Sequence, residues 1–503
     1  MSSFVHKCLA LVLPLIIIKV CAQSQLLAEH GDEFTVLTYN VENLFDLDGL
    51  SMFSDYEQDI QTDPFGYSRA KLLTKLETIA SVLKTVNGGA GPELIFFQEL
   101  EADLTPHNSI IDVDDFLEKY AHITVSEMLG DAWQQTYAGF PVELWLAKAL
   151  AESGMIGYEV ATSPSRGLES KIAHTNAIFS RFPLNGVRLH PLEQARDIIE
   201  AEIRINGHPL IVFVNHWKSG ASNPKREPIR VKNAEVLRSL IDDRLDVDPM
   251  SDIIVLGDLN SHYNHSSLYP DMQTGINDVL ESSGCESFIE NDLYNLWYEL
   301  PAQERYAEVW RGHIGTLMHI ILTPGLYDER GISYIDGSFR QLILPGINAD
   351  AIGRPLKWHF AGEAGGGASD HFPIYARFTI MPFEKKGTLS EGNDTLDYEP
   401  ALNVSNYSGT LNLPDGAFLN KLSDTELSGY VANLFEVEAT ILGIDPLRIK
   451  VSDRLWPAYY TDQSLIREGG LLDLIGAGES RLVVQPNFYK GNSQLVVEAI
   501  LPE

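Results

Sequence analysis

The chain has 503 residues, of which 44% are apolar and 21% are charged, a balance that excludes an intrinsically disordered protein. It carries 70 Asp and Glu residues against 37 Lys and Arg residues, so its formal net charge is -33. This excess of negative charge excludes a protein that coats nucleic acid or anionic membrane through bulk positive charge. A negatively charged ligand would have to be bound by a local basic patch or through a metal ion.

The N-terminus predicts export from the cell. Lys7 precedes an apolar run over residues 8–18, and Val20 and Ala22 supply small residues at the −3 and −1 positions, which is typical of a signal peptide (residues 1–22) cleaved after Ala22. A buried N-terminal helix is the alternative. The run is shorter than the about 20 residues that cross a bilayer, and no other stretch reaches that length, so we expect no transmembrane segment. The sequence thus predicts a secreted or periplasmic protein that retains only Cys285 of its cysteines.

Strand-like and helix-like patterns alternate over residues 30–380. Strands are expected at 34–39, 94–97, 177–180, 209–214, 253–256, 319–322 and 374–378, which are apolar runs rich in β-branched or aromatic residues. Helices are expected at 68–86 and 230–245, where apolar residues recur at helical spacing. Residues 101–154 have helical patterning and form an insertion. This alternation predicts a domain of the α/β class.

A second domain is expected after a boundary near Phe383. Residues 384–424 are rich in Gly, Ser, Asn, Pro and Asp, which is typical of a linker. Strand-like runs return at 431–442, 481–485 and 494–501. Residues 384–503 therefore predict a linker followed by a small β-rich domain, in which no motif indicates a function.

Polar residues stand at the ends of five predicted strands. They are Asn40 and Glu42, Gln98 and Glu99, Asn215 and His216, Asp258 and Asn260, and Asp370 and His371. Strand ends are where a sheet presents functional side chains to a cleft. Each residue alone is compatible with a turn or a cap, but five such groups in this order predict one catalytic site.

The motifs TYNVENLFD, QE after an apolar strand, GDLN and SDHFP resemble those of the endonuclease/exonuclease/phosphatase superfamily. The resemblance covers about residues 34–380, and TYNVENLFD with VNHWKSG is most similar to exported bacterial members. It implies an α/β (α+β) fold, a four-layer α/β/β/α sandwich, to which this chain adds the helical insertion and the C-terminal β-rich domain. It also implies a hydrolase that cleaves phosphoester bonds with a divalent metal.

Phosphodiester hydrolysis needs charge neutralisation on the non-bridging oxygens, and a hard cation such as Mg²⁺ supplies it through oxygen ligands. We expect Glu99 to bind Mg²⁺, with Mn²⁺ or Ca²⁺ as alternatives. The amide oxygen of Asn40 and the carboxylate of Asp370 are the further ligands that we expect. Glu42 is compatible either with this site or with a solvated turn.

Four residues are predicted to act in catalysis. His371 is expected to be the base or to stabilise the phosphate, since histidine titrates near working pH. Asp258 would orient the attacking water, and Asn260 would donate a hydrogen bond to the phosphate. His216 stands where the resemblance places a second histidine, and it would protonate the leaving oxygen.

A basic cluster follows His216 directly. Its predicted phosphate-facing members are Lys218, Lys225 and Arg226, with Arg230 and Lys232 further along the same segment. The alternative is a solvated start of the helix. In so acidic a chain the cluster stands out, and its functional interpretation is a rim that faces substrate phosphates.

Met318 departs from the pattern that the resemblance implies, because the family usually has an Asp there that partners the catalytic histidine. Three alternatives follow: another group supports His371, catalysis is weakened, or the protein has another task. Without a neighbouring carboxylate, we expect the pKa of His371 to be lower than in a paired site. Replacing Met318 with Asp would then raise the rate.

The sequence leaves the substrate open. A secreted nuclease acting on DNA is the first expectation. A lipid or small-molecule phosphodiesterase or phosphatase, similar to the sphingomyelinases, is the second and would expose aromatic residues near the site, with Trp217 as a candidate. A catalytically impaired binding protein on the same scaffold is the third.

Overall fold

The computed structural model describes residues 32–53, 56, 66–105, 112–285, 293–385, 402, 404, 407, 411–466, 470–489 and 492–502. The predicted signal peptide lies outside these residues. Within them, no helix combines the length and the apolar character that a membrane span requires.

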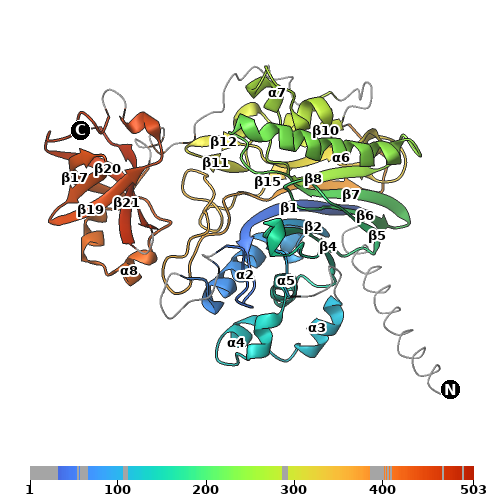
Figure 1. Ribbon diagram of the computed structural model, residues 1–503, viewed down its shortest axis with the longest axis horizontal. Coiled ribbons are helices and arrows are strands. Elements are labelled where there is room, and N and C mark those ends of the chain that lie inside the picture. The colour runs from blue at the N-terminus through green and yellow to red at the C-terminus, as the bar shows by residue number, and fades with distance from the viewer. Residues whose placement is uncertain are drawn as a thin grey trace.

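Two seven-stranded sheets form the centre of the first domain (Figure 1). The first sheet has the order β14-β16-β1-β2-β4-β3, with β15 beside β16. Its strands are β1 (Glu33–Leu44), β2 (Leu94–Glu101), β3 (Glu159–Thr162), β4 (His174–Ser180), β14 (Ser333–Tyr334), β15 (Arg340–Gln341) and β16 (Ile374–Thr379). The second sheet has the order β5-β6-β7-β8-β13-β10-β9. Its strands are β5 (Leu184–His190), β6 (Ile198–Ile205), β7 (His208–His216), β8 (Ile253–Asp258), β9 (Ser282–Ser283), β10 (Leu293–Asn295) and β13 (Met318–Leu322).

Helices cover the outer face of each sheet, so the predicted four-layer sandwich is confirmed (Figure 1). Apolar residues of α2 (Arg69–Leu83) and α5 (Val142–Glu152) pack against the outer face of the first sheet. Helix α6 (Glu227–Leu245) packs on the second sheet, through Leu237 and Ile241. A third core lies between the sheets, where Val36 of β1 and Val212 of β7 belong to one cluster. The segment between β2 and β3 also holds α3 (Val113–Lys119) and α4 (Val125–Leu129), and α7 (His265–Leu268) follows β8.

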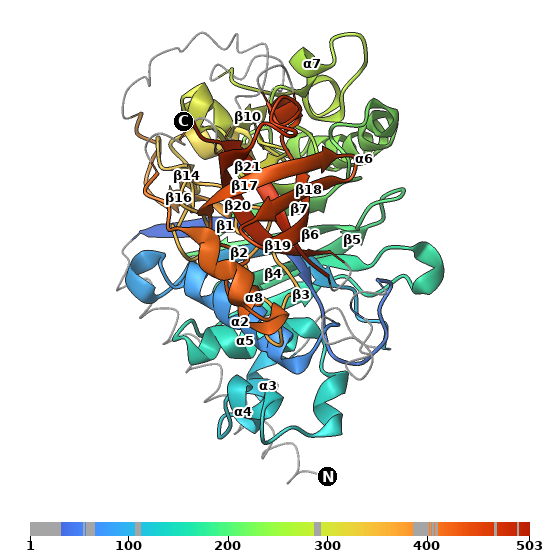
Figure 2. The same ribbon diagram turned by 90° about the vertical axis from the view of Figure 1, so that its left-hand side faces the viewer.

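The C-terminal β-rich domain is a closed barrel with its own core (Figure 2). Its strands are β17 (Phe435–Ile444), β18 (Leu447–Val451), β19 (Arg454–Tyr460), β20 (Glu479–Tyr489) and β21 (Asn492–Ile500), preceded by α8 (Asp424–Ser428). The barrel contacts the first domain where Ile352 packs with Val483 and Leu501. Arg354 donates to Glu498 at 2.9 Å across the same contact.

Parallel pairing gathers the strand ends that carry the candidate site. Strand β1 runs parallel to β2, and β7 runs parallel to β8. His216 pairs directly with Asp258, and Asn40 pairs with Gln98. Since paired residues on neighbouring strands point to the same side, the polar ends of all four strands face one another across the sandwich.

Candidate active site

A bulge in β2 turns Glu99 toward the site. Ile95 and Phe97 face the helices, and regular alternation would turn Glu99 to the same side. The pairing register shifts between Gln98 and Leu100, so that Leu100 takes the helix-facing position. Glu99 has φ = 66° and contacts Asn40 on the inter-sheet side instead. This is a common use of a bulge: it redirects one side chain at the end of a strand.

Close approach of β7 and β8 requires a glycine before Asp258. Gly257 has φ = +118°, and a Cβ atom there would lie 2.1 Å from the backbone oxygen of Asn215. The following turn is fixed by the backbone N–H of Asn260, which donates to Oδ1 of Asp258 at 2.9 Å. The amide of Asn260 donates to the carbonyl of Trp217 at 3.3 Å. The GDLN motif therefore builds a rigid support for Asp258.

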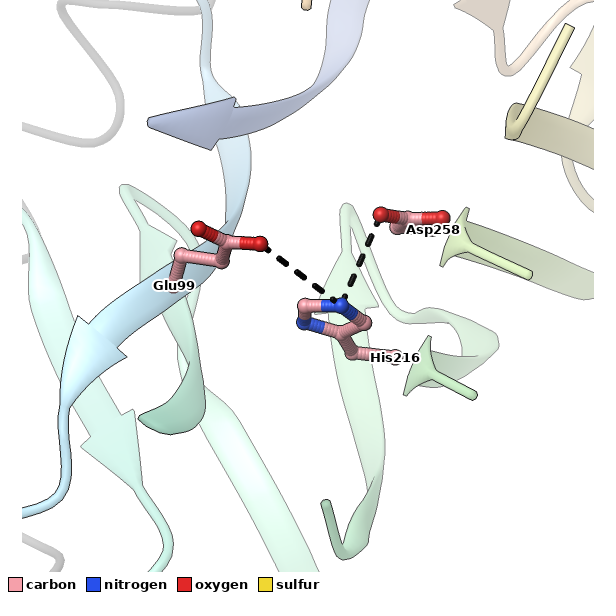
Figure 3. Close-up of side chains that lie close together, drawn as sticks. All are labelled: Glu99, His216 and Asp258. Atoms are coloured by element: carbon pink, nitrogen blue, oxygen red, sulfur yellow. Dashed lines mark ion pairs between the residues drawn. The ribbon is translucent and has the colours of Figure 1, made fainter. Parts of the chain in front are cut away.

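Glu99, His216 and Asp258 come from three different strands and converge (Figure 3). Nε2 of His216 lies 3.8 Å from Oε1 of Glu99 and 3.5 Å from Oδ2 of Asp258. Asn40 joins the two carboxylates, because its amide nitrogen donates to Glu99 at 3.1 Å and to Asp258 at 3.0 Å. Burial raises the pKa of both Glu99 and Asp258.

The amide of Asn40 has a fixed orientation. Its oxygen accepts the backbone N–H of Glu42 at 3.0 Å, while its nitrogen faces Glu99 and Asp258. Asn40 thus presents hydrogen-bond donors to the carboxylates in this arrangement, whereas the predicted metal ligand was its oxygen. To bind a cation, the amide would have to turn and release Glu42.

His371 has a carboxylate partner, although Met318 stands where the sequence pattern would have supplied one. Its Nδ1 lies 2.8 Å from Oδ1 of Asp370, and its Nε2 lies 3.9 Å from Oδ2 of Asp258. Burial opposes the charge on the ring, but Asp370, Asp258 and Glu308 outweigh it and raise the pKa of His371. The expectation of a lowered pKa is therefore wrong. Met318 is fully buried between the sheets, and the first of the three alternatives, another group at His371, is the one observed.

Glu308 is a second carboxylate beside His371. It lies in the hairpin formed by β11 (Glu308–Trp310) and β12 (His313–Gly315), and its backbone forms a bridge with His371. Its two carboxylate oxygens accept the N–H of Leu317 at 3.2 and 3.1 Å. Burial raises the pKa of Glu308 to about 7 against the opposing charge of His371. No pattern around this short hairpin predicted a strand, so sequence reasoning missed Glu308.

Arg196 and His174 also border the site and were missed. Arg196 Nη2 lies 2.9 Å from Nδ1 of His174, whose ring stacks on His216 with centroids 6.5 Å apart. Burial, followed by the positive charge of Arg196, lowers the pKa of both His174 and His216 well below the usual value. His216 is thus held as a neutral imidazole. The signal for Arg196 was weak, because it lies in a loop without a recognisable motif.

The residues of the predicted basic cluster take three kinds of position. Arg226 donates to the carbonyl of Ser219 at 3.0 Å, and Arg196 donates to that of Trp217 at 3.5 Å, so both contact the backbone next to Lys218. Arg230 is buried in an ion pair with Glu227 at 2.6 Å and supports the fold instead. Lys225 is exposed on the surface.

Glu42 and Trp217 take positions that the sequence left open. The carboxylate of Glu42 accepts the N–H of Trp358 at 2.7 Å, and burial followed by the charge of Asp370 raises its pKa. Glu42 therefore belongs to the surroundings of Asp370 and is not a solvated turn residue. Trp217 is fully buried and donates to Asn215 at 3.1 Å, so it is not an exposed aromatic residue.

The site fits a divalent cation by its donor atoms. One ligand atom each from Glu99, His216 and Asp258 lies within 4.8 Å of the others. Two carboxylates so close together repel each other, and Nδ1 of His216 and Nε2 of His371 are buried without hydrogen-bond partners. Glu99 would hold such an ion, since carboxylate oxygens suit Mg²⁺, and Asp258 lies beside it. Asp370 is instead paired with His371.

Residues 148–379 match the model of the Endonuclease/Exonuclease/phosphatase family. This part of the chain begins in α5 and contains His216, Asp258, Asn260, Asp370 and His371, while Asn40 and Glu99 precede it. This match agrees with the resemblance seen in the motifs.

Several solved structures are similar to the chain at low identity. Truncated TDP2 of Caenorhabditis elegans has 13% identity over 69% of this chain and 98% of its own, with a TM-score of 0.35. The human Nocturnin catalytic domain with bound sulfate has 13% identity, covering 70% and 95%, and a TM-score of 0.36. A mannosyl-6-phosphatase of Bacteroides thetaiotaomicron has 13% identity, covering 69% and 99%, and a TM-score of 0.36. No curated protein matches the chain. At these TM-scores, none of the likenesses bears on what the chain hydrolyses.

Proposed function

We propose that the protein is a secreted, divalent-metal-dependent phosphodiesterase that acts on nucleic acid, with DNA as the first substrate. The observation that carries the proposal is the convergence of Glu99, Asp258 and His371 from both sheets. Two carboxylates able to hold a cation stand beside a histidine that its neighbours keep charged. When bound, the cation would neutralise charge on the phosphate.

Each residue has a role that its surroundings support. Attack by water forms one P–O bond and breaks another, so the water must lose a proton and the leaving oxygen must gain one. Asp258, with its raised pKa, accepts the proton of the water. His371, charged and with Nε2 unpartnered, donates to the leaving oxygen. The lowered pKa of His216 makes it unsuited to the proton-donor role that the sequence suggested.

A positively charged rim supports a polyanionic substrate. Arg226 and Arg196 contact the backbone of Ser219 and Trp217 on either side of Lys218, just after His216, in a chain whose overall charge is strongly negative. Purified protein should nick supercoiled plasmid DNA in the presence of Mg²⁺, and EDTA or His371→Asn should abolish nicking. Cleavage of sphingomyelin or a sugar phosphate, with plasmid DNA left intact, would overturn the choice of substrate.

An N-terminus at Gln23 in the exported protein would support secretion.

A lipid phosphodiesterase is the second candidate, and Trp310 is the residue that favours it. Trp310 is 58% exposed and lies two residues after Glu308 in strand β11. However, Lys357 and Arg311 lie over its ring, with distances of 5.4 and 5.6 Å to the centroid. Cations around an aromatic ring suit a stacked base with its phosphates better than insertion into acyl chains. Trp310→Ala should therefore raise KM for DNA and leave a small diester unaffected.

A further inference from the structure

We propose that Asp46, Asp48, Glu101 and Asp103 form a second cation site, separate from Glu99 and Asp258, which binds Ca²⁺ and joins the ends of β1 and β2. Asp46 and Asp48 follow β1, while Glu101 is the last residue of β2 and Asp103 comes two residues later. One carboxylate oxygen from each of the three aspartates lies within 4.8 Å of the others. Glu101 adjoins them, because its Oε2 accepts the N–H of Asp46 at 2.9 Å.

Backbone donors fix the orientation of the aspartates. Oδ1 of Asp46 accepts the N–H of Asp48 at 2.9 Å, and Oδ1 of Asp48 accepts the N–H of Leu50 at 2.7 Å. Oδ1 of Asp103 accepts both the N–H and the hydroxyl of Thr105, at 2.9 and 2.7 Å. One oxygen of each carboxylate is thus occupied, and the second oxygen remains available to a ligand.

The available oxygens are buried and have no partner. Oδ2 of Asp48, Oε1 of Glu101 and Oδ2 of Asp103 lack hydrogen bonds, and the Glu101 residue is only 4% exposed. Buried carboxylate oxygens are costly unless a donor or a cation contacts them. Glu101 lies outside the aspartate triad, so its unpartnered oxygen independently indicates a missing ligand at this place.

The charges around the cluster have the same sign. The carboxylates of Asp46, Asp48 and Asp103 lie close together, and the carboxylate of Glu101 contacts the backbone of Asp46, so their negative charges repel one another. A divalent cation would remove this repulsion. A proton shared between two of the carboxylates is the competing way to relieve this repulsion.

The number and chemistry of the oxygens favour Ca²⁺. Calcium takes 6–8 oxygen ligands in flexible geometry and accepts several protein carboxylates. Magnesium demands near-ideal octahedral geometry and is usually bound through only one or two carboxylates together with water. The described cluster contains no cysteine or histidine, the ligands that favour Zn²⁺.

The site would stabilise the candidate active site at a distance. Phe45, next to Asp46, packs edge-on against His174 with ring centroids 5.5 Å apart, and His174 stacks on His216. Strands β1 and β2 also carry Asn40 and Glu99. Joining their ends would restrict movement of both strands at the point where they supply those residues.

The test uses the full chain after removal of metals with EDTA. Calorimetric titration with CaCl₂ should show a site that persists in Glu99→Gln but weakens at least tenfold in Asp46→Asn/Asp103→Asn. Asp243→Asn, on the exposed side of α6, is the matched control and should bind as the unaltered chain does. Ca²⁺ should also raise Tm in the unaltered chain and in Glu99→Gln, and equal Mg²⁺ should raise it less.

Two results would overturn the proposal. If Glu99→Gln binds no Ca²⁺, the Ca²⁺ that the unaltered chain binds is held at Glu99 and not at the acidic cluster. The second result is that the single substitution Asp46→Asn raises Tm and that Ca²⁺ does not change the Tm of the unaltered chain. The carboxylates of the cluster would then be stabilised by shared protons and not by a cation. Loss of the proposed hydrolase activity in other tests would leave Ca²⁺ binding unaffected, so the two proposals fail independently.

Discussion

Nδ1 of His371 lies 2.8 Å from Oδ1 of Asp370, the residue immediately before it in the chain. Asp370 thereby supplies the negative charge that Met318 cannot, and it does so from the same loop as the histidine. The negative charge of Asp370 raises the pKa of His371, and the positive charge of His371 lowers the pKa of Asp370 against the effect of burial. The pair keeps His371 charged at neutral pH.

Asp370→Asn should slow hydrolysis by about tenfold or more and move the alkaline limb of the pH–rate profile to lower pH. Removing the negative charge lowers the pKa of His371, so the ring loses its proton earlier as pH rises. Profiles of kcat for a small diester, with Asp243→Asn as control, measure this. A changed Mg²⁺ requirement without a pH shift would instead assign Asp370 to the metal, as the sequence suggested.

Met318→Asp should lower Tm and bring no gain in rate, contrary to the sequence-based expectation. Position 318 pairs with Asp258 in register and is fully buried, so a new carboxylate there would be buried close to Asp258. Met318→Leu, which keeps an apolar side chain, should preserve both Tm and rate. Thermal unfolding with initial-rate assays distinguishes these outcomes, and a faster folded Met318→Asp enzyme would show that His371 lacks support.

Arg226→Ala should weaken DNA binding more than Lys225→Ala does. Arg226 donates to the carbonyl of Ser219, next to Lys218, whereas its neighbour Lys225 is exposed. Loss of one phosphate contact should reduce the slope of log Kd against log salt by about 1. Binding of a DNA duplex at several salt concentrations tests this. If the two substitutions weaken DNA binding equally, the rim does not contact the substrate.

Asp252 should make stability depend on pH. Burial raises its pKa to about 7, and its Oδ2 accepts the N–H of Ile332 at 2.8 Å. The unfolded chain releases this proton near pH 4, so the folded state holds a proton that the unfolded state has lost, and stability falls as pH rises from about 4 to 7. Between pH 5 and pH 8, the Tm of Asp252→Asn should fall by about 3 °C or more less than the Tm of the unaltered chain. An unchanged loss of Tm would show that Asp252 ionises normally.

The sequence predicted those parts of the site that are local in the chain. GDLN and SDH carry their own turns, so Asp258, Asn260 and His371 could be placed from the motif alone. Glu308 and Arg196 could not, because the β11–β12 hairpin and a loop bring them in from distant parts of the chain.

The layers were predictable where apolar runs are long. Helix α2 begins one residue after the expected start and ends three residues before the expected end, and strand β8 contains its expected range. In the barrel, β18 was missed, although its five residues alternate between buried and exposed. Such a short alternation is common in loops, and only pairing with β17 and β19 makes it a strand.

The most direct test of the central claim is the Mg²⁺ dependence of bis-(p-nitrophenyl) phosphate hydrolysis by the unaltered chain, Glu99→Gln and Asp258→Asn. Glu99 and Asp258 supply the two carboxylates of the ligand cluster, whereas Asp243→Asn leaves that cluster intact. We predict that EDTA abolishes turnover and that Mg²⁺ restores it. Glu99→Gln should need more Mg²⁺ and turn over at least about a hundredfold more slowly, and Asp258→Asn should be slower still, while the control is unaffected. Turnover that is insensitive to EDTA and to both substitutions would contradict the account.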